Sequence, residues 1–510
     1  MKYFTIILSL LSATLYAQPG IQWSYNFGGS GDESIAGILQ TSDGNFVMAG
    51  RTSSDDHDVS SSHGGWEVWV AKFDASGSIL WEHSYGGTVD DTPFELIKTN
   101  EGGFAIAGYS NSPDGDVGGT NGVRDFWVLK LNSAGALEWA ETYGGSGDDR
   151  AYSIAQTDDD GFIVTGYTDS DDGDVIGQHG QDDLWVVKLS SSGALQWQNT
   201  LGGTDWEQGF SVEQTDDGGY ILCGRAGSSD GDVSANYGDW DVWIVKLTSS
   251  GSIDWEKNFG GSSTDNGIRA RQTADGGFIF TASTWSEDED VTGAHDDVEL
   301  WNVKLDATGD IEWQRAMGGW AGDYAGDVWQ SADGGFVSVG TTRSDDGDIS
   351  SMPDGYDVWM IKSDALGVIE WEFTAGGGSQ EDGYYLAPTM DGGYIIGGQT
   401  LSDDGDVPGN YGSRDLWIIK VEGEPLSVQE NRQNELSVGP VPSNGALFVS
   451  LKNPVHNVVI ELVDLSGRVV WQSLINGTLQ LFQLDAVAPG PYLLRLELED
   501  GIQVRQVVLR

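Results

Sequence analysis

Two sets of seven tryptophans recur along the chain, and within each set the spacing is a constant 58 residues. The first set is Trp23, Trp81, Trp139, Trp197, Trp255, Trp313 and Trp371, and the second is Trp69, Trp127, Trp185, Trp243, Trp301, Trp359 and Trp417. A fixed period of this length indicates one supersecondary unit copied seven times, each copy burying its apolar face against the next. The repeat therefore limits the fold to a closed ring or an open stack of similar units.

Each copy contains four short segments of β type, separated by turn residues. In the third copy they run over 149–157, 162–168, 183–189 and 194–201. Their apolar and β-branched residues show no helical periodicity, which predicts a four-stranded antiparallel sheet per copy. Seven such sheets around an axis form a seven-bladed β-propeller over residues 21–423, an all-β fold with few exposed sheet edges. An open β-solenoid is the alternative, but its repeats are usually shorter and need caps.

The two ends of the repeat region favour the closed ring. The chain enters at Ile21 with a lone fourth-strand sequence, and the seventh copy stops after its third strand, 415–421. A blade of three strands would leave an apolar edge unpaired. We therefore expect 22–27 to pair with 415–421, and both sets of repeated tryptophans to lie in the core between blades.

The first seventeen residues have the pattern of a secretory signal peptide. Lys2 supplies a positive start, 4–11 an apolar stretch and 13–17 a small-residue cleavage region. No later segment is apolar for long enough to cross a membrane. Cys223 is the sole cysteine, so an internal disulfide is excluded and stability must come from packing.

The net charge of −55 is concentrated in the repeats, because the residues from Asn431 onward include 6 basic and 7 acidic side chains. Such a surface repels nucleic acid and anionic membranes, attracts divalent cations and keeps a protein in solution. We expect a monomer that does not bind nucleic acid and has no membrane span.

Acidic residues recur at four places in every copy, and the predicted strand order puts all of them on one face of the ring. One follows the double glycine and begins the first strand, two form an Asp-x-Asp loop between the second and third strands, and one begins the third strand. Calcium suits such oxygen-rich loops, and we predict calcium sites in which the acids of one copy act together. The loop looks like a shortened relative of the calcium loops of integrin-type propellers. The alternative is that the aspartates order the loop by accepting hydrogen bonds from backbone amides. The predicted ligands are Asp149, Asp172, Asp174 and Asp183; Glu207, Asp230, Asp232 and Asp241; and Asp323, Asp346, Asp348 and Asp357.

The opposite face carries a recurrent acid in the first turn and a lysine at the end of the third strand of every copy, for example Asp159 and Lys188. A lysine repeated seven times is not a catalytic group. We predict that it forms a structural ion pair or binds a backbone carbonyl.

Residues that differ between copies are the better candidates for ligand binding, since the shared ones are occupied by folding. Five non-periodic tryptophans fall in loops of the acidic face: Trp66, Trp206, Trp240, Trp285 and Trp320. Aromatic rings beside carboxylates suit sugar binding through stacking and hydrogen bonds to hydroxyls. The alternative is that each ring packs under its own loop.

We found no motif of a catalytic nucleophile, a phosphate-binding loop or paired histidines at metal spacing. Repeated carboxylates do not identify an acid–base pair, although propellers also host glycosidases and lyases. We therefore predict a binding or adhesion module for a glycan or another extracellular ligand. The alternative is a polysaccharide-acting enzyme that uses the acidic face.

After a polar linker at 424–434, residues 435–510 lack the repeat. Short β-type runs at 447–451, 458–464, 469–473, 492–498 and 504–509 predict a small antiparallel sandwich. Three motifs of this module resemble the C-terminal sorting domain of the type IX secretion system: 439–445 (GPVPSNG), 463–470 (VDLSGRVV) and 489–494 (PGPYLL). The resemblance implies export through the type IX translocon, cleavage by a sortase, and a product that is released or fixed to the cell surface. The residues that it marks for sorting are Pro442, Gly445, Asp464, Gly467, Arg468, Gly490 and Tyr492.

Overall fold

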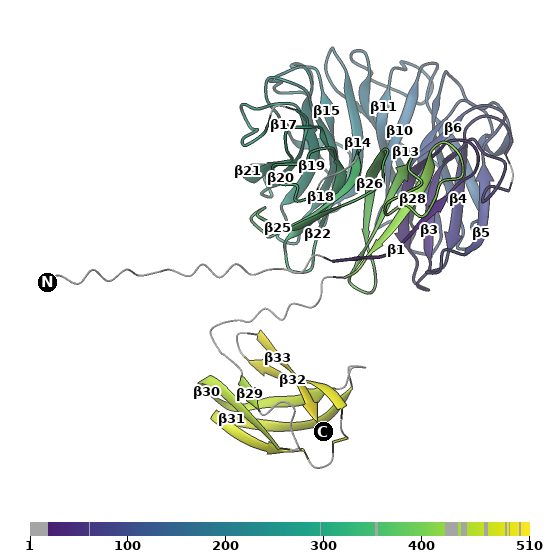
Figure 1. Cartoon of the computed structure of the whole chain (residues 1–510). Coiled ribbons are helices and arrows are strands. Elements are labelled where there is room, and N and C mark those ends of the chain that lie inside the picture. The colour runs from purple at the N-terminus through teal and green to yellow at the C-terminus, as the bar shows by residue number, and fades with distance from the viewer. Residues whose placement is uncertain are drawn as a thin grey trace. The chain divides into compact units, whose positions relative to one another are not determined.

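A computed structural model gives the fold of the chain, which divides into two compact units, Met1–Glu424 and Pro425–Arg510 (Figure 1). The structure describes residues 19–60, 62–295, 297–351, 355–423, 437–439, 446–463, 468–484, 487–488, 490–498 and 501–509. The predicted signal peptide at 1–17 and the linker at 424–434 lie outside these residues.

The first unit consists of seven four-stranded antiparallel sheets, as predicted, and each sheet is one blade. Blades one to three are β2 (Glu33–Gln40), β3 (Phe46–Thr52), β4 (Glu67–Phe73) and β5 (Ile79–Tyr85); β6 (Asp91–Lys98), β7 (Phe104–Ser110), β8 (Asp125–Leu131) and β9 (Leu137–Tyr143); and β10 (Asp149–Gln156), β11 (Phe162–Thr168), β12 (Asp183–Leu189) and β13 (Leu195–Leu201). A short 3-10 turn, η1 (Gly115–Val117), lies between β7 and β8.

Blades four to six repeat the arrangement, and blade seven takes its fourth strand from the start of the chain. They are β14 (Glu207–Gln214), β15 (Tyr220–Ala226), β16 (Asp241–Leu247) and β17 (Ile253–Phe259); β18 (Asp265–Gln272), β19 (Phe278–Thr284), β20 (Glu299–Leu305) and β21 (Ile311–Met317); β22 (Asp323–Gln330), β23 (Phe336–Thr342), β24 (Asp357–Ser363) and β25 (Ile369–Ala375); and β26 (Glu381–Pro388), β27 (Tyr394–Thr400), β28 (Asp415–Val421) and β1 (Ile21–Phe27).

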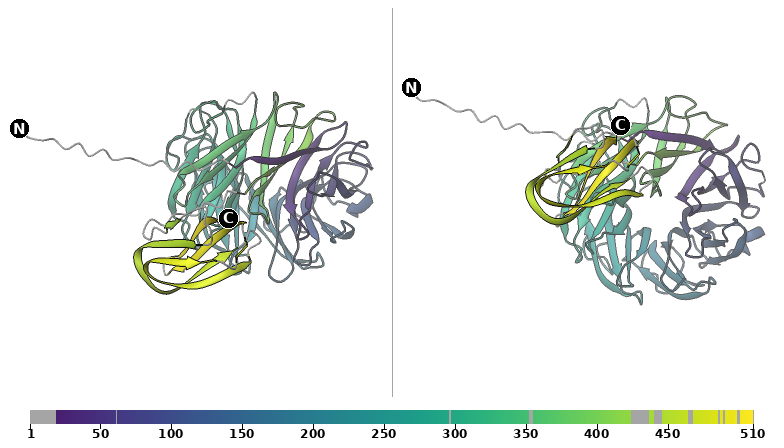
Figure 2. Two further views of the ribbon diagram at one scale, coloured as in Figure 1. Left: turned by 60° about the horizontal axis from the view of Figure 1, so that its bottom comes forward. Right: turned by 90° about the horizontal axis from the view of Figure 1, so that it is seen from below.

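The first strands of the blades form the inner wall of a propeller. The first strand of each blade contacts the first strand of the next, and β2 of blade one contacts β26 of blade seven. The sheets follow one another around a ring in the right-hand view of Figure 2. In every blade a β-bulge interrupts the pairing of the first strand with the second. The bulge lies where the first strand faces the axis, and it sets which side chains point inward.

The predicted closure of the ring is confirmed. β1 pairs antiparallel with β28, and the register runs from Ile21 opposite Val421 to Phe27 opposite Leu416. A backbone hydrogen bond from Glu422 N to Gly20 O, 2.9 Å long, extends this contact beyond the strands. Blade seven therefore has the same four strands as the others, and neither end of the repeat region leaves an unpaired apolar edge.

The tryptophans of the third strands form the core between blades, as predicted. All seven are fully buried. Trp185, for example, packs on Phe126 of the preceding blade with 4.5 Å between ring centroids, and its Nε1 donates to Gln198 Oε1 at 2.8 Å.

For the fourth-strand tryptophans the prediction holds only in part, since they pack against the core between blades but most are not fully buried. Six of the seven are only partly buried, and only Trp371 is buried, at 5% exposure. Each of these rings lies at the rim, for example Trp139 against Gly193 in a turn of the next blade, where an added Cβ would come within 3.1 Å of the ring. Trp139 Nε1 also donates to Ser191 O of that turn at 3.2 Å. These tryptophans join neighbouring blades at the surface.

On the face opposite the acidic loops the predicted ion pair is present in all seven blades. The lysine that ends the third strand pairs with the acid of the first turn, as Lys188 does with Asp159 at 3.0 Å. Lys188 Nζ also donates to Leu189 O at 3.0 Å. The other six pairs are Lys72–Asp43, Lys130–Glu101, Lys246–Asp217, Lys304–Asp275, Lys362–Asp333 and Lys420–Asp391.

The second unit is an antiparallel sheet of five strands, β29 (Ser437–Gly439), β30 (Ala446–Val463), β31 (Val469–Gln483), β32 (Gly490–Leu498) and β33 (Gly501–Leu509). Two runs predicted as separate strands, 447–451 and 458–464, are the two halves of β30, whose pairing with β31 is irregular between Ser450 and Val458. Both halves contribute to one hydrophobic core, with Leu447 and Val449 from the first half and Ile460 and Leu462 from the second.

Replacing Trp185 by alanine should lower the free energy of unfolding by about 3–5 kcal/mol, because a large cavity forms between two blades. Trp197→Ala should cost less, about 1–2 kcal/mol, because that ring is already partly exposed in the native protein. Denaturant unfolding of the mature protein and the two variants measures both losses. Equal losses would contradict the division of the tryptophans into core and rim.

Candidate functional site

The acid at the start of each first strand holds two connections together on the acidic face. Asp149 accepts hydrogen bonds from Gly145 N and Ser170 Oγ, both at 2.8 Å, and from Thr168 Oγ1. Gly145 belongs to the connection that enters the blade, and Ser170 to the loop between the second and third strands. All seven acids are fully buried and accept from the equivalent glycine amide: Glu33, Asp91, Asp149, Glu207, Asp265, Asp323 and Glu381. The carboxylate at this position therefore stabilises the fold.

The first aspartate of the loop pair also accepts from a backbone amide. Asp172 Oδ1 lies 2.6 Å from Ser146 N, Asp230 Oδ1 lies 2.8 Å from Thr204 N, and Asp346 Oδ1 lies 3.0 Å from Trp320 N. These contacts agree with the alternative to calcium, in which the aspartates order the loop by binding backbone amides. The amides come from the neighbouring connection, however, and not from the aspartate's own turn.

The acids of one copy do not gather as predicted, because the third-strand acid meets the next blade. A Cβ added to Gly144 would lie 2.9 Å from Asp125 Oδ1 of blade two and 2.5 Å from Asp149 Oδ2 of blade three. Gly144 N donates to Asp174 Oδ2 at 3.4 Å, so three carboxylates from two blades surround this glycine.

The same regrouping moves the predicted ligands Asp183, Asp241 and Asp357 away from the acids of their own copies. Asp183 lies with Glu207 at Gly202, Asp241 with Asp265 at Gly260, and Asp357 with Glu381 at Gly376. The sequence pattern could not reveal this, because a strand end and the following connection belong to different copies.

Within the described part of the chain, no three His, Cys, Asp or Glu side chains are arranged to hold a metal ion. Calcium therefore stays a prediction. Repulsion between the carboxylates is reduced in another way, because some of them hold a proton more tightly. Burial raises the pKa of Asp149 to about 6, of Asp241 to about 7 and of Asp415 to about 6. Asp241 Oδ1 and Asp415 Oδ1 are buried without a hydrogen-bond partner among the described residues, as are the matching oxygens of Asp125 and Asp183.

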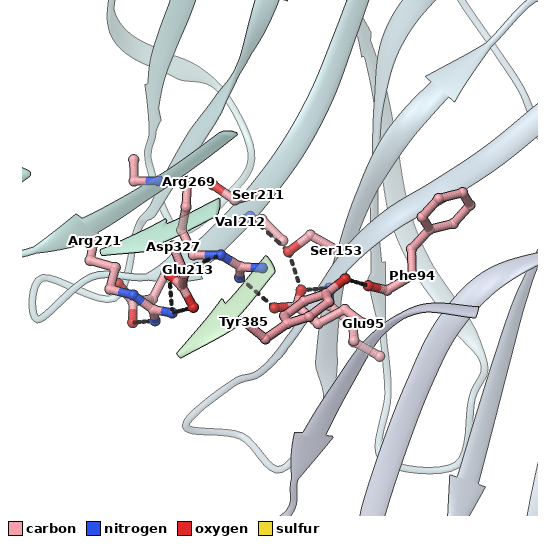
Figure 3. Close-up of polar contacts among 12 residues, drawn as sticks. Phe94, Glu95, Ser153, Ser211, Val212, Glu213, Arg269, Arg271, Asp327 and Tyr385 are labelled. Carbon is pink, nitrogen blue, oxygen red and sulfur yellow. Dashed lines mark hydrogen bonds and ion pairs between the residues drawn. The ribbon is translucent and has the colours of Figure 1, made fainter. Parts of the chain in front are cut away.

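The axis of the propeller is crossed by a polar network (Figure 3). Arg269 of β18 forms an ion pair with Glu95 of β6, on a blade three positions away around the ring, and its Nε lies 3.5 Å from Asp327 Oδ1 of β22. Ser153 Oγ donates to Glu95, and Tyr385 donates from its hydroxyl to Phe94 O. These residues share one repeat position, just after the β-bulge of the first strand, and it differs in nearly every blade: Gly37, Glu95, Ser153, Ser211, Arg269, Asp327 and Tyr385.

A cavity of about 450 Å³ opens toward the acidic face over blades five to seven, and we call it the aromatic pocket. Three residues of its wall, Asn266, Tyr324 and Asp382, come three positions before the axial residues of their strands. The wall also includes Ile268, Ser283, Trp285, Ala325, Thr341, Tyr356, Gln380 and Tyr384.

The inward residue just before the axial position differs between the two sides of the ring. In blades two to four that residue is aromatic, and the rings pack on one another: Phe94 lies 4.6 Å from Tyr152, which lies 5.2 Å from Phe210. In blade six it is Gly326, where an added Cβ would lie 2.4 Å from Gly383 O. The missing side chain lets the first strand of blade seven lie close to that of blade six, and Tyr324 and Tyr384 of these two strands line the same pocket.

The five predicted tryptophans do not form one site. Trp206 and Trp240 stack on blade four with centroids 6.0 Å apart, whereas Trp66 lies under Arg51 at the seam between blades seven and one. Trp320 is 62% exposed, beside His295. Only Trp285 lines the aromatic pocket, and it also lines a second cavity of about 410 Å³ with Asp239 and Ser262.

The tyrosines of the aromatic pocket escaped prediction. Tyr324, Tyr356 and Tyr384 are unremarkable within a β-type run, and only the strand order brings them together. One signal was available: Tyr324 replaces Ser34, Thr92, Arg150, Gln208 and Asn266 of earlier copies. Variation at an inward position of the first strand marks the mouth of a propeller.

The C-terminal unit is similar to a known protein family. Residues 437–510 match the family described as the secretion system C-terminal sorting domain. This unit is a type IX secretion sorting domain. The protein is therefore exported through that system to the cell surface or beyond it. No helix among the described residues is long and apolar enough to cross a membrane.

Within the sorting domain, Tyr492 is buried at 8% exposure and donates from its hydroxyl to Ala488 O at 2.8 Å. Gly490 begins β32, and Arg468 is exposed just before β31. Pro442, Gly445, Asp464 and Gly467 lie outside the described residues.

No curated protein sequence matches the chain. Among solved structures, PorZ, a surface component of the type IX secretion system of Porphyromonas gingivalis, is 12% identical with a TM-score of 0.40. The match covers 95% of this chain and 60% of PorZ. A fungal alcohol oxidase of the AA5 family, solved with copper, is 11% identical with a TM-score of 0.44, covering 97% of this chain and 100% of the oxidase.

Stability should fall as the pH rises from 5 to 8. The raised pKa values of Asp149, Asp241 and Asp415 mean that the folded state keeps protons that the unfolded chain has already released above its ordinary carboxyl pKa of about 4. This stabilisation is complete below pH 4 and is lost as the pH rises through 6 to 7. Asp241→Asn should flatten the fall and add about 1 kcal/mol at pH 8. Thermal unfolding across this range tests both statements.

The control for this prediction is Asp159→Asn on the opposite face. Burial opposes ionisation of Asp159, but hydrogen bonds from Thr157 and Lys188 outweigh it and lower its pKa to about 2. Its stabilisation is therefore lost only below pH 4, and the variant should keep the slope between pH 5 and 8. A wild-type profile that is flat or rises with pH would contradict the burial of protonated carboxyls.

Proposed function

We propose that the exported propeller is a binding module for glycans and that the aromatic pocket is its principal site. The observation that supports this most directly is a 450 Å³ cavity in which aromatic side chains alternate with amide and carboxyl groups. Sugar sites have this composition, since aromatic rings stack on the apolar faces of pyranose rings and polar groups bind the hydroxyls.

The aromatic rings are accessible and held in place. Trp285 and Tyr324 are each 37% exposed, and Tyr384 is 38% exposed. Trp285 meets Tyr324 edge to face with 6.2 Å between centroids, and Tyr324 lies 6.3 Å from Tyr356. Rings fixed against each other lose little conformational entropy on binding, which favours affinity.

The polar groups of the pocket are also oriented. Asp382 is buried at 7% exposure and accepts from Gln399 Nε2 at 2.9 Å and from Gln380 Nε2 at 3.1 Å. Gln399 Nε2 also donates to Tyr384 Oη at 3.1 Å. A sugar hydroxyl that reaches this network would meet acceptors and donors in fixed directions.

Polysaccharide cleavage is the competing function. Glycoside hydrolysis generally needs two carboxyl groups across the scissile bond. Among the described residues that line the aromatic pocket, Asp382 is the single carboxylate, and two amides already bind it. This composition favours binding without turnover.

Calcium remains our proposal for the acidic face. Because no three carboxylates among the described residues are arranged to hold a metal ion, calcium would have to draw together carboxylates between blades, such as Asp125 and Asp174, in place of the acids of one copy. An unchanged melting temperature after chelation would remove calcium from the account.

A glycan array probed with the mature protein, with and without a chelator, tests the proposed function. Trp285→Ala and Tyr324→Ala should each weaken binding about tenfold or more, because each removes a stacking surface at the centre of the pocket. Trp320→Ala is the control, since that ring is well exposed and does not line the pocket. Binding lost in all three variants, or product released from any polymer, would contradict a binding module centred on this pocket.

A further inference from the structure

Four arginines on the acidic face form no ion pair with a described residue, although the chain has far more acidic than basic residues. The protein has 80 acidic and 25 basic residues, and most described lysines and arginines form ion pairs with acids. In the described part of the chain, no acid pairs with Arg51, Arg225, Arg343 or Arg414. Three of them lie over aromatic rings: Arg51 over Trp66 at 4.3 Å, Arg225 over Trp240 at 4.1 Å and Arg343 over Tyr356 at 5.5 Å.

Two of these arginines meet in one cavity at the closing seam of the ring. A pocket of about 360 Å³, here the seam pocket, is lined by Arg51 and Trp66 of blade one and by Arg414 of blade seven, which precedes β28. Arg51 Nε is buried and has no hydrogen-bond partner among the described residues. A guanidinium fixed over a ring, with its donors unused, is a ready binding group for an anion.

The acids of the seam pocket do not neutralise these arginines. Glu33 lines the pocket, but its carboxylate is taken up by Thr52 Oγ1 at 2.7 Å, Ser54 Oγ at 2.6 Å and Gly29 N at 3.0 Å. Asp32 is the second acid there, and no ion pair joins it to Arg51 or Arg414 within the described residues.

The same repeat position elsewhere in the ring provides a direct comparison. Arg124 is the counterpart of Arg414, and it is satisfied by Asp148 at 2.8 Å. Arg150 binds the same carboxylate at 2.7 Å. At the seam, Asp32, Ser34 and Arg51 take the places of Asp148, Arg150 and Tyr167 of blade three. The carboxylate is repeated at the seam as Asp32, but no ion pair joins it to Arg414 within the described residues.

The two pockets are linked through blade seven, because Tyr384 Oη accepts from Gln399 Nε2 at 3.1 Å and the seam-pocket residue Leu401 follows Gln399 by two positions. Burial and the charge of Asp382 raise the pKa of the Tyr384 phenol, and the positive charges of Arg414 and Arg51 oppose that rise, so both guanidinium groups lie within electrostatic reach of it. A ligand bound against Tyr384 is therefore close to two unpaired arginines. On the other side of the aromatic pocket, Arg343 lies over the wall residue Tyr356.

We infer that the seam pocket binds an anionic group, a carboxylate or a sulfate, on a sugar unit of the glycan that occupies the aromatic pocket. This inference rests on the proposed function and narrows it to acidic glycans. Arg51 and Arg414 bind the anion through paired N–H donors, and Trp66 fixes the plane of the Arg51 guanidinium. The negative surface around the pocket adds specificity. It repels an acidic polymer unless the anionic groups of that polymer pair with these arginines.

Calorimetric titration of the mature protein with oligosaccharides of equal length tests the inference. The probes are an oligogalacturonate, a sulfated galactan fragment and a neutral galactan fragment, each at low and at high salt. The acidic probes should bind about tenfold tighter than the neutral one at low salt, and the advantage should shrink as salt increases. Arg414→Gln should remove the advantage. Its matched control, Arg124→Gln, should keep it, because Arg124 is already paired.

Asp32→Asn provides a second variant that does not depend on deleting an arginine. Removing this negative charge should strengthen binding of the acidic probes several-fold and leave the neutral probe unchanged. If Arg414→Gln fails to fold, as its melting curve would reveal, Asp32→Asn decides the question alone. Equal binding of acidic and neutral probes, or an unchanged preference in the variants that fold, overturns the acidic-ligand inference only. Failure to bind any of the three probes overturns the proposed function as well.

Discussion

Pairing of β1 with β28 is the contact on which the rest of the propeller depends. It joins residues about four hundred positions apart in the chain, and the loop entropy of that closure must be offset by the core it completes. Once the ring is closed, each third-strand tryptophan is buried between two blades. The same closure creates the seam pocket, since Arg51 and Arg414 meet only when blades seven and one are neighbours.

The repeated polar contacts explain how so acidic a chain folds. The buried acids of the first strands are not exposed charge, because amide and hydroxyl donors from two connections surround each of them. On the other face, lysines offset the acids of the first turns. Between blades, carboxyls such as Asp241 hold protons more tightly than in water. Repulsion is thus reduced by hydrogen bonds, ion pairs and protons, each at a repeated position.

Much of the architecture could be predicted because the period of 58 residues fixes the number of blades and the lone strand at Ile21 implies closure. The lysine and acid of each copy could be paired for the same reason, since their positions repeat within one sheet. Contacts between copies were harder to predict. Asp183 was grouped with Asp149 of its own copy, but it meets Glu207 of the next. The pocket tyrosines come together only through the strand order and the glycine at 326. In the sorting domain, two short runs are one irregular strand, because apolar patterning does not distinguish a bend from a turn.

Hydrogen exchange of the backbone amides of β1 tests ring closure most directly. The amides of Trp23 to Phe27 should be as strongly protected as those of β9, the fourth strand of blade two, because both strands pair along their length with a buried third strand. Exchange of the β1 amides within seconds, while β9 stays protected for hours, would show that the ring is open. The seam pocket, and the assignment of loops to one face, would then be lost.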